Sequence, residues 1–231
     1  MLSMKGLTKI YRTESVETHA LSDLSLEVNE GEFIALMGPS GSGKSTFLNI
    51  AGLLDDFDSG TYKLNDHDVS QLNDGGRSRI RNSQIGFIFQ AYNLIPELNI
   101  YDNVDVPLRY RGFRSATRKE LIMSALDTVG LAKRPKHFPR QLSGGQQQRV
   151  AIARALAGDP KLILADEPTG NLDSTMATQI MGLLGEINAH GTTIVMVTHD
   201  PDLSRHAHRR VHIHDGRIAD SSQPKLVKEG A

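Results

Sequence analysis

A glycine-rich stretch near residue 40 has the residue types that bind phosphate. It follows the apolar run 33–37, precedes a predicted helix over 45–54, and fits the pattern G-x-x-x-x-G-K-[ST]. Its residues are Gly38, Pro39, Ser40, Gly41, Ser42, Gly43, Lys44, Ser45 and Thr46. Glycines leave backbone N–H groups free to surround phosphate oxygens, and the helix start adds favourable partial charge. We expect Lys44 to neutralise the β and γ phosphates of a nucleotide, Ser45 to ligate Mg²⁺ and Thr46 to contact the α phosphate. An ordinary glycine turn is disfavoured by the flanking strand and helix.

Two carboxylates follow a second apolar run, residues 162–165. Asp166 stands at the end of this predicted strand, where a Mg²⁺-holding carboxylate belongs, and Glu167 beside it is suited to polarise an attacking water. Taken alone, such a pair is more often a solvated turn. The phosphate-binding stretch upstream is what favours the catalytic interpretation.

A third motif precedes a helix predicted over 146–157 and provides a second anion-binding helix start. Its residues are Leu142, Ser143, Gly144, Gly145 and Gln146. One phosphate loop does not need a second such site in the same chain, so the pair suggests a head-to-tail dimer. Together with the two motifs above, this pentapeptide resembles the signature sequence of the ABC ATPase family.

The resemblance covers nearly the whole chain and implies an ATPase that uses ATP and Mg²⁺. In the family, each ATP lies between the phosphate loop of one subunit and the signature of the other, so a homodimer encloses two nucleotides. The implied catalytic residues are Glu167, His199 and Gln90, and the implied Mg²⁺ ligands are Ser45, Gln90 and Asp166. Tyr11 resembles the aromatic residue that stacks on adenine, and the loop that crosses the dimer interface would be Asn171, Leu172 and Asp173. Purely structural roles for Tyr11, Gln90 and His199 are the alternatives.

The fold expected is α/β: an ABC-type nucleotide-binding domain with a RecA-like, mostly parallel sheet core, an antiparallel β subdomain and an inserted α-helical subdomain. Apolar runs predict strands over 2–9, 24–28, 33–37, 162–165 and 193–197, alternating with helices that include 177–187. Residues 13–18 are polar and are expected to loop out. From residue 77 the composition becomes charged and typical of helices. We divide the single domain 1–231 into a catalytic core with the β subdomain (1–90 and 158–231) and a helical subdomain carrying the signature (91–157).

Residues 85–96, with Asn103, Val104 and the segment 167–173, resemble the branch of macrolide-exporter and lipoprotein-release ATPases. That branch implies a motor that drives a separately encoded membrane permease with a large extracytoplasmic domain. An amino-acid-type importer and a cell-division-type ABC ATPase are the alternatives. Apolar residues after Gln90 predict a docking groove for the permease, unless they pack the helical subdomain instead; they are Tyr92, Leu94, Ile95, Leu98 and Tyr101.

Composition narrows the remaining possibilities. With 26 basic and 27 acidic residues among 231, no basic field attracts nucleic acid, and we expect no nucleic-acid partner. Apolar runs are too short to span a bilayer, residues 1–9 do not resemble a signal peptide, and the absence of cysteine suits a reducing cytoplasm. We expect a peripheral protein on the cytoplasmic face of the inner (plasma) membrane, bound through the permease. An ABC ATPase acting on DNA or ribosomes is disfavoured by the lack of coiled coils and zinc sites, and a catalytically silent scaffold by Glu167 and His199. The cargo and the direction of transport do not follow from the sequence.

Overall fold

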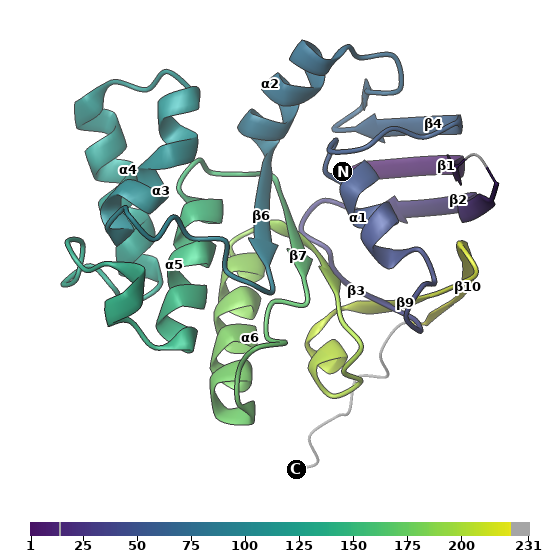
Figure 1. Cartoon of the computed structure of the whole chain (residues 1–231). Coiled ribbons are helices and arrows are strands. Elements are labelled where there is room, and N and C mark those ends of the chain that lie inside the picture. Colours follow the sequence, from purple (N-terminus) through teal and green to yellow (C-terminus); the bar gives the residue numbers. More distant parts are fainter. Residues whose placement is uncertain (14, 223–231) are drawn as a thin grey trace.

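A six-stranded sheet forms the centre of the computed structural model, which describes residues 1–13 and 15–222 (Figure 1). Its strand order is β10-β9-β3-β8-β7-β6, and all neighbours are parallel except β9 and β10. The strands are β3 (Phe33–Met37), β6 (Ile85–Phe89), β7 (Leu162–Asp166), β8 (Thr193–Val197), β9 (Arg209–His214) and β10 (Arg217–Ser222). Strands β3 and β8 are apolar at nearly every position because both faces of the sheet are covered.

A second, antiparallel sheet has the order β2-β1-β4-β5. Its strands are β1 (Leu2–Arg12), β2 (Glu17–Val28), β4 (Ser59–Leu64) and β5 (His67–Asp68). The α/β fold with a mostly parallel core and an antiparallel sheet is thus confirmed. The β1–β2 hairpin is longer than expected, since Arg12 pairs with Glu17 inside the predicted loop. Both faces of the hairpin tip are exposed, so the sequence there lacks the alternation that marks a half-buried strand.

The described part of the chain contains six α-helices: α1 (Lys44–Ala51), α2 (Asp74–Gln84), α3 (Ile100–Tyr110), α4 (Ser115–Thr128), α5 (Gly144–Leu156) and α6 (Ser174–Ala189). Short 3₁₀ turns lie at Pro139–Gln141 and Leu203–His206. Four α-helices begin where a side chain accepts a hydrogen bond from the N–H three residues on, the usual N-cap. These caps are Asn73, Asn99, Ser143 and Asp173.

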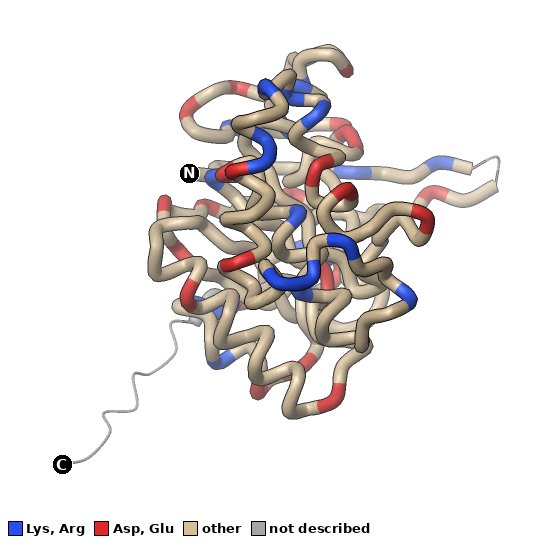
Figure 2. Tube along the Cα trace, turned by 90° about the vertical axis from the view of Figure 1, so that its left-hand side faces the viewer, with Lys and Arg blue, Asp and Glu red and all other residues tan. Residues whose placement is uncertain are grey.

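Helices α3, α4 and α5 pack together beside the main sheet (Figure 1). The charged, helix-like composition that begins at residue 77 does not mark the start of this helical group. The first helix in that stretch is α2, which is followed by β6, an edge strand of the main sheet. Helix α2 has no buried residue, so its basic side chains reflect exposure. Viewed from the side of α3 and α4, Lys and Arg are interspersed with Asp and Glu along the chain (Figure 2).

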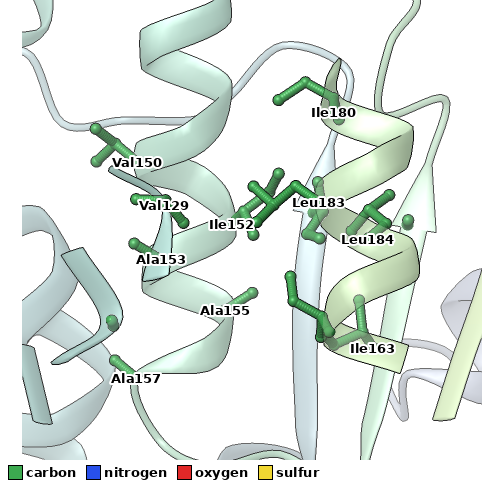
Figure 3. Packing of buried hydrophobic residues seen from close by; sticks show 14 of the residues in the cluster. Val129, Val150, Ile152, Ala153, Ala155, Ala157, Ile163, Ile180, Leu183 and Leu184 are labelled. Atoms are coloured by element: carbon green, nitrogen blue, oxygen red, sulfur yellow. The ribbon is translucent and has the colours of Figure 1, made fainter. Parts of the chain in front are cut away.

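The helix of the signature motif shares a core with α6. Ile152 of α5 points toward Leu183 of α6 above Ile163 of β7, and all three side chains are buried (Figure 3). Helices α5 and α6 therefore hold the loops at their N-termini in a fixed relation to the sheet.

Within residues 1–13 and 15–222, no helix combines the length and apolar character of a membrane span.

Candidate functional site

A pocket of about 610 Å³ lies at the carboxyl ends of β3, β7 and β8. Ligands of open parallel sheets bind at this edge, because the loops that follow the strands converge there. The pocket brings together the following predicted residues: Tyr11, Gly38, Ser40, Gly41, Gly43, Lys44, Ser45, Thr46, Asp166, Glu167 and His199. Segments far apart in the sequence thus meet as the motifs predict.

Strand β2 also contributes to the pocket, although no sequence motif points to it. Thr18, His19 and Ala20 lie beside the glycine-rich loop. They carry no recognisable motif, and the longer β1–β2 hairpin is what brings them to the site. Only the hairpin register, with Tyr11 opposite Thr18, could have placed them there.

The glycine-rich loop has a backbone that only glycine allows. Gly43 has φ 102°, and a Cβ there would lie 2.4 Å from the carbonyl oxygen of Ala20. A Cβ on Gly38 would lie 2.1 Å from the carbonyl oxygen of Ile213. Lys44 Nζ donates to the carbonyl oxygens of Gly38 at 2.9 Å and Pro39 at 2.7 Å, so its charge lies over the loop.

Ser42 is 3% exposed, and its Oγ has no hydrogen-bond partner among the described residues. Ser42 does not line the pocket, so this hydroxyl is not part of the phosphate site. The loop glycines, Lys44 and the start of α1 do line it, and they fit a bound polyphosphate.

The carboxylates at the end of β7 have unusual surroundings. Burial raises the pKa of Asp166, the charge of Glu167 raises it further, and Lys44 opposes the shift. A divalent cation would relieve this cost, and Asp166 and Ser45 are the pocket residues suited to hold Mg²⁺. Glu167 has φ 43°, a strained conformation for a residue other than glycine, and its N–H donates to the carbonyl oxygen of Val197 at 3.0 Å. His199 Nδ1 lies 3.0 Å from Glu167 Oε1, so the two side chains are held together at the mouth of the pocket.

Replacing Asp166 with Asn should stabilise the protein without ligand. The pKa of Asp166 is higher in the folded protein than in the unfolded chain. At a pH above this raised pKa the ionised carboxylate therefore destabilises the folded state, and the effect disappears as the pH falls below the ordinary carboxyl range. Solvent screening keeps the gain small, roughly 1–2 °C in Tm at pH 7.5. Thermal unfolding with EDTA should show the gain at pH 7.5 and a smaller one near pH 4.5. A loss of Tm at pH 7.5, or an equal gain at both pH values, would contradict this electrostatic interpretation.

Gln90 lies after β6 but does not line the pocket. Asn171 Nδ2 donates to the Gln90 carbonyl oxygen at 2.9 Å, and Gln90 Nε2 donates to Asn171 Oδ1 at 3.5 Å. The predicted interface loop and the predicted Mg²⁺ ligand thus contact each other in this structure. Of the three predicted Mg²⁺ ligands, Ser45 and Asp166 line the pocket in this structure and Gln90 does not.

The signature motif forms a separate site at the start of α5. Ser143 Oγ accepts from the N–H of Gln146 at 3.3 Å, and Gln146 Oε1 accepts from the N–H of Ser143 at 3.1 Å. The Ser143 hydroxyl proton remains free for another acceptor. A Cβ on Gly145 would lie 2.6 Å from Met176 Sδ, so α5 closely approaches the start of α6, where Asp173 is the cap. None of the five signature residues lines the pocket.

The sequence model of a family described as "ABC transporter" matches residues 21–170. The chain is 47% identical over 218 residues to the uncharacterized ABC transporter ATP-binding protein YvrO of Bacillus subtilis, covering 94% of this chain and 95% of that protein. It is 44% identical to the lipoprotein-releasing system ATP-binding protein LolD of Hyphomonas neptunium, covering 95% and 97%. It is also 46% identical to the macrolide export ATP-binding/permease protein MacB 1/2 of Paracoccus denitrificans, covering 94% of this chain but 33% of that protein.

A solved structure is similar over almost the whole length. The dimeric post-hydrolysis state of the ATP-binding cassette MJ0796, bound to ADP and Pi, superposes with a TM-score of 0.88 at 42% identity, covering 96% of this chain and 98% of that one. The motifs, the fold and the relatives agree. The chain belongs to the ABC transporter family, and within that family it is an ATP-binding protein that hydrolyses ATP.

Proposed function

We propose that this protein is the motor subunit of a membrane transport complex, dimerising around two Mg²⁺–ATP to drive a separately encoded permease. The observation that carries the proposal is the separation of the pocket from the signature motif within one chain. Each of them is half of a nucleotide site, so a second copy of the chain must supply the missing half. The dimeric MJ0796 cassette supports this arrangement.

In the proposed reaction, Lys44 and the loop N–H groups hold the phosphates, while Tyr11 stacks on adenine. Mg²⁺, held by Ser45 and Asp166, would screen the charge of the phosphate oxygens. Glu167 accepts a proton from the water that attacks the γ phosphate, releasing ADP and phosphate. His199 keeps Glu167 oriented and faces the γ phosphate. Ser143 of the second copy donates its free hydroxyl proton to the same phosphate.

Mixed dimers test this shared site directly. When one chain carries both Lys44→Ala and Ser143→Arg and its partner is normal, both sites are inactivated, because each site takes one half from each chain. When the two substitutions are on different chains, one site is inactivated and the other stays intact. With two affinity tags to isolate mixed dimers, we expect ATP hydrolysis only when the substitutions are on different chains. Equal hydrolysis by both mixed dimers would contradict the head-to-tail arrangement.

We propose that the permease docks in a groove of about 1080 Å³ between α2, β6 and the end of α3. This groove is not lined by the residues for which apolar density predicted docking, which are Tyr92, Leu94, Ile95, Leu98 and Tyr101. Leu94 and Tyr101 instead pack against the core, as the alternative foresaw. The lining combines apolar side chains, Phe87, Phe89, Val106 and Phe113 among them, with Tyr110, which is 82% exposed.

Charge favours a partner segment that carries carboxylates. Among the described residues that line the groove, four are arginines, at positions 79, 81, 111 and 154, and none is acidic. Three of these arginines donate to backbone carbonyls: Arg81 to Leu53, Arg111 to Gly158 and Arg154 to Asn93. A cytoplasmic helix of the permease with apolar and acidic residues fits this surface.

Tyr110→Asp should remove the permease without affecting the motor. The side chain is almost fully solvated, so the fold tolerates the change, but a buried carboxylate at the docked interface costs at least about tenfold in affinity. Ile95→Asp is the matched control, because Ile95 is 41% exposed and lies outside the groove. We expect membranes to retain the Ile95 variant and lose the Tyr110 variant, with equal ATP hydrolysis by the two purified chains. The opposite retention pattern would place docking on the segment after Gln90.

The relatives favour an exporter or lipoprotein-release system over the alternatives. The names of the MacB and LolD proteins refer to macrolide export and lipoprotein release, and both match nearly the whole of this chain. In such a system the permease has a large extracytoplasmic domain, and the motor is peripheral, on the cytoplasmic face of the inner membrane. An amino-acid-type importer and a cell-division-type complex remain the alternative assignments.

A further inference from the structure

A carboxylate that does not line the nucleotide pocket holds the aromatic ring of Tyr11. Tyr11 Oη donates to Asp55 Oδ2 at 2.6 Å, although the two residues are 44 positions apart. Asp55 Oδ1 also accepts from Lys9 Nζ at 2.9 Å, and this ammonium lies 5.0 Å from the centroid of the Tyr11 ring. Side chains of β1 and of the segment after α1 therefore form one connected network.

The position of Asp55 is fixed by α1. After the helix ends, Leu53 turns the chain with φ 56°, and the N–H groups of Leu54 and Asp55 donate to the Asn49 carbonyl oxygen at 2.8 Å and 3.3 Å. Helix α1 begins at Lys44, within the phosphate-binding loop. Asp55 is thus tied to the far end of the short helix whose first residue, Lys44, lines the pocket.

The charge states favour a strong hydrogen bond. Burial raises the pKa of Tyr11, and Asp55 raises it further, so the phenol stays protonated at neutral pH. Burial alone would raise the pKa of Asp55, but the hydrogen bonds from Tyr11 and Lys9 outweigh it and leave that pKa below its ordinary value. A neutral phenol therefore donates to a carboxylate, and such charge-assisted bonds are short and strong.

We propose that Asp55 is a positioning residue for the nucleotide base. By holding the Tyr11 hydroxyl, it fixes the plane of the ring on which adenine stacks and sets that plane relative to α1 and the phosphate loop. Tyr11 is 41% exposed near the tip of a hairpin, so losing this bond gives its ring more freedom to turn away from the base. The inference rests on the proposed stacking role of Tyr11.

Two ligands separate base positioning from general stability. ATP contains the base, whereas inorganic tripolyphosphate keeps the phosphates and lacks it. Calorimetric titration with Mg²⁺ would give the Kd of both for Asp55→Ala, Asp55→Asn, Tyr11→Phe and Tyr11→Ala. Asp56→Ala is the matched control, because the Asp56 carboxylate is more exposed and pairs with Arg77 instead of Tyr11.

Asp55→Ala should raise the Kd for ATP about fivefold to tenfold, less than the full strength of a hydrogen bond to a charged group, because this bond orients the ring and does not contact the ligand. It should leave the Kd for tripolyphosphate unchanged, and Asp55→Asn, which keeps an acceptor, should recover most of the loss. Tyr11→Phe should match Asp55→Ala, and combining the two should add nothing further, because they break the same bond.

Three results would overturn the inference. Equal weakening of both ligands by Asp55→Ala would show a structural role only. An unchanged Kd for ATP in Asp55→Ala, with a raised Kd in Tyr11→Ala, would show that the ring needs no anchor and would leave its stacking role intact. An unchanged Kd in Tyr11→Ala would remove the stacking role itself, and with it the premise of the inference.

Discussion

Glu167→Gln should lower the rate of ATP hydrolysis about 10²–10⁴-fold, the usual contribution of a general base. The amide keeps the size of the side chain and a hydrogen-bond acceptor for His199, which lies 3.0 Å from Oε1 in the native protein. It cannot take a proton from water at neutral pH. The strained backbone at Glu167 aims the side chain toward the pocket and is unchanged by the substitution. Phosphate release from purified protein with Mg²⁺–ATP measures the effect.

The same variant should bind ATP and remain a dimer, because hydrolysis is what separates the halves. Size-exclusion chromatography with Mg²⁺–ATP should show a dimer for Glu167→Gln, and a monomer when ADP replaces ATP. Glu186→Gln is the matched control: Glu186 lies on α6, away from the pocket lining, and its loss should leave hydrolysis unchanged. Rapid turnover by Glu167→Gln would assign the general base to another group.

Lys44→Ala should weaken ATP binding about a hundredfold, since it removes a charge-assisted contact to two phosphates. The fold should be kept, because among the described residues the side chain donates hydrogen bonds only to the carbonyl oxygens of Gly38 and Pro39. Titration calorimetry with Mg²⁺–ATP measures the affinity, and an unchanged Tm would show that the loss is local.

Lys63→Ala controls for the loss of one positive charge, because Lys63 is an exposed residue of β4. Lys44→Arg tests geometry: a guanidinium keeps the charge but not the compact shape of an ammonium, so recovery should be partial. ATP binding within threefold of normal in Lys44→Ala would show that the backbone N–H groups alone hold the phosphates.

The sequence was most informative where one short motif contains all the interacting groups. The glycine-rich loop predicts its own geometry, because strand, loop and helix are contiguous and only glycine tolerates the backbone at Gly43. The carboxylates follow β7 and the histidine follows β8, and neighbouring parallel strands bring their ends together. For these residues, spacing along the chain and closeness in space have the same cause.

Features set by long-range contacts could not be predicted in this way. The hairpin tip carries exposed side chains on both faces, so no alternation marked the strands around Tyr11. The Tyr11–Asp55 bond joins residues 44 positions apart, and neither belongs to a motif that points to the other. Docking residues were predicted from the apolar density after Gln90, but part of that density reflects packing, since Leu94 packs against the core.

The proposed motor function is tested most directly by purifying the tagged protein from detergent-solubilised native membranes with Mg²⁺–ATP and identifying its partners by mass spectrometry. We expect a membrane permease with a large extracytoplasmic domain, present with the native protein and absent with Tyr110→Asp. A multi-helix importer would contradict the assigned branch. Recovery of no membrane protein would contradict the transport role altogether and would leave only the ATPase.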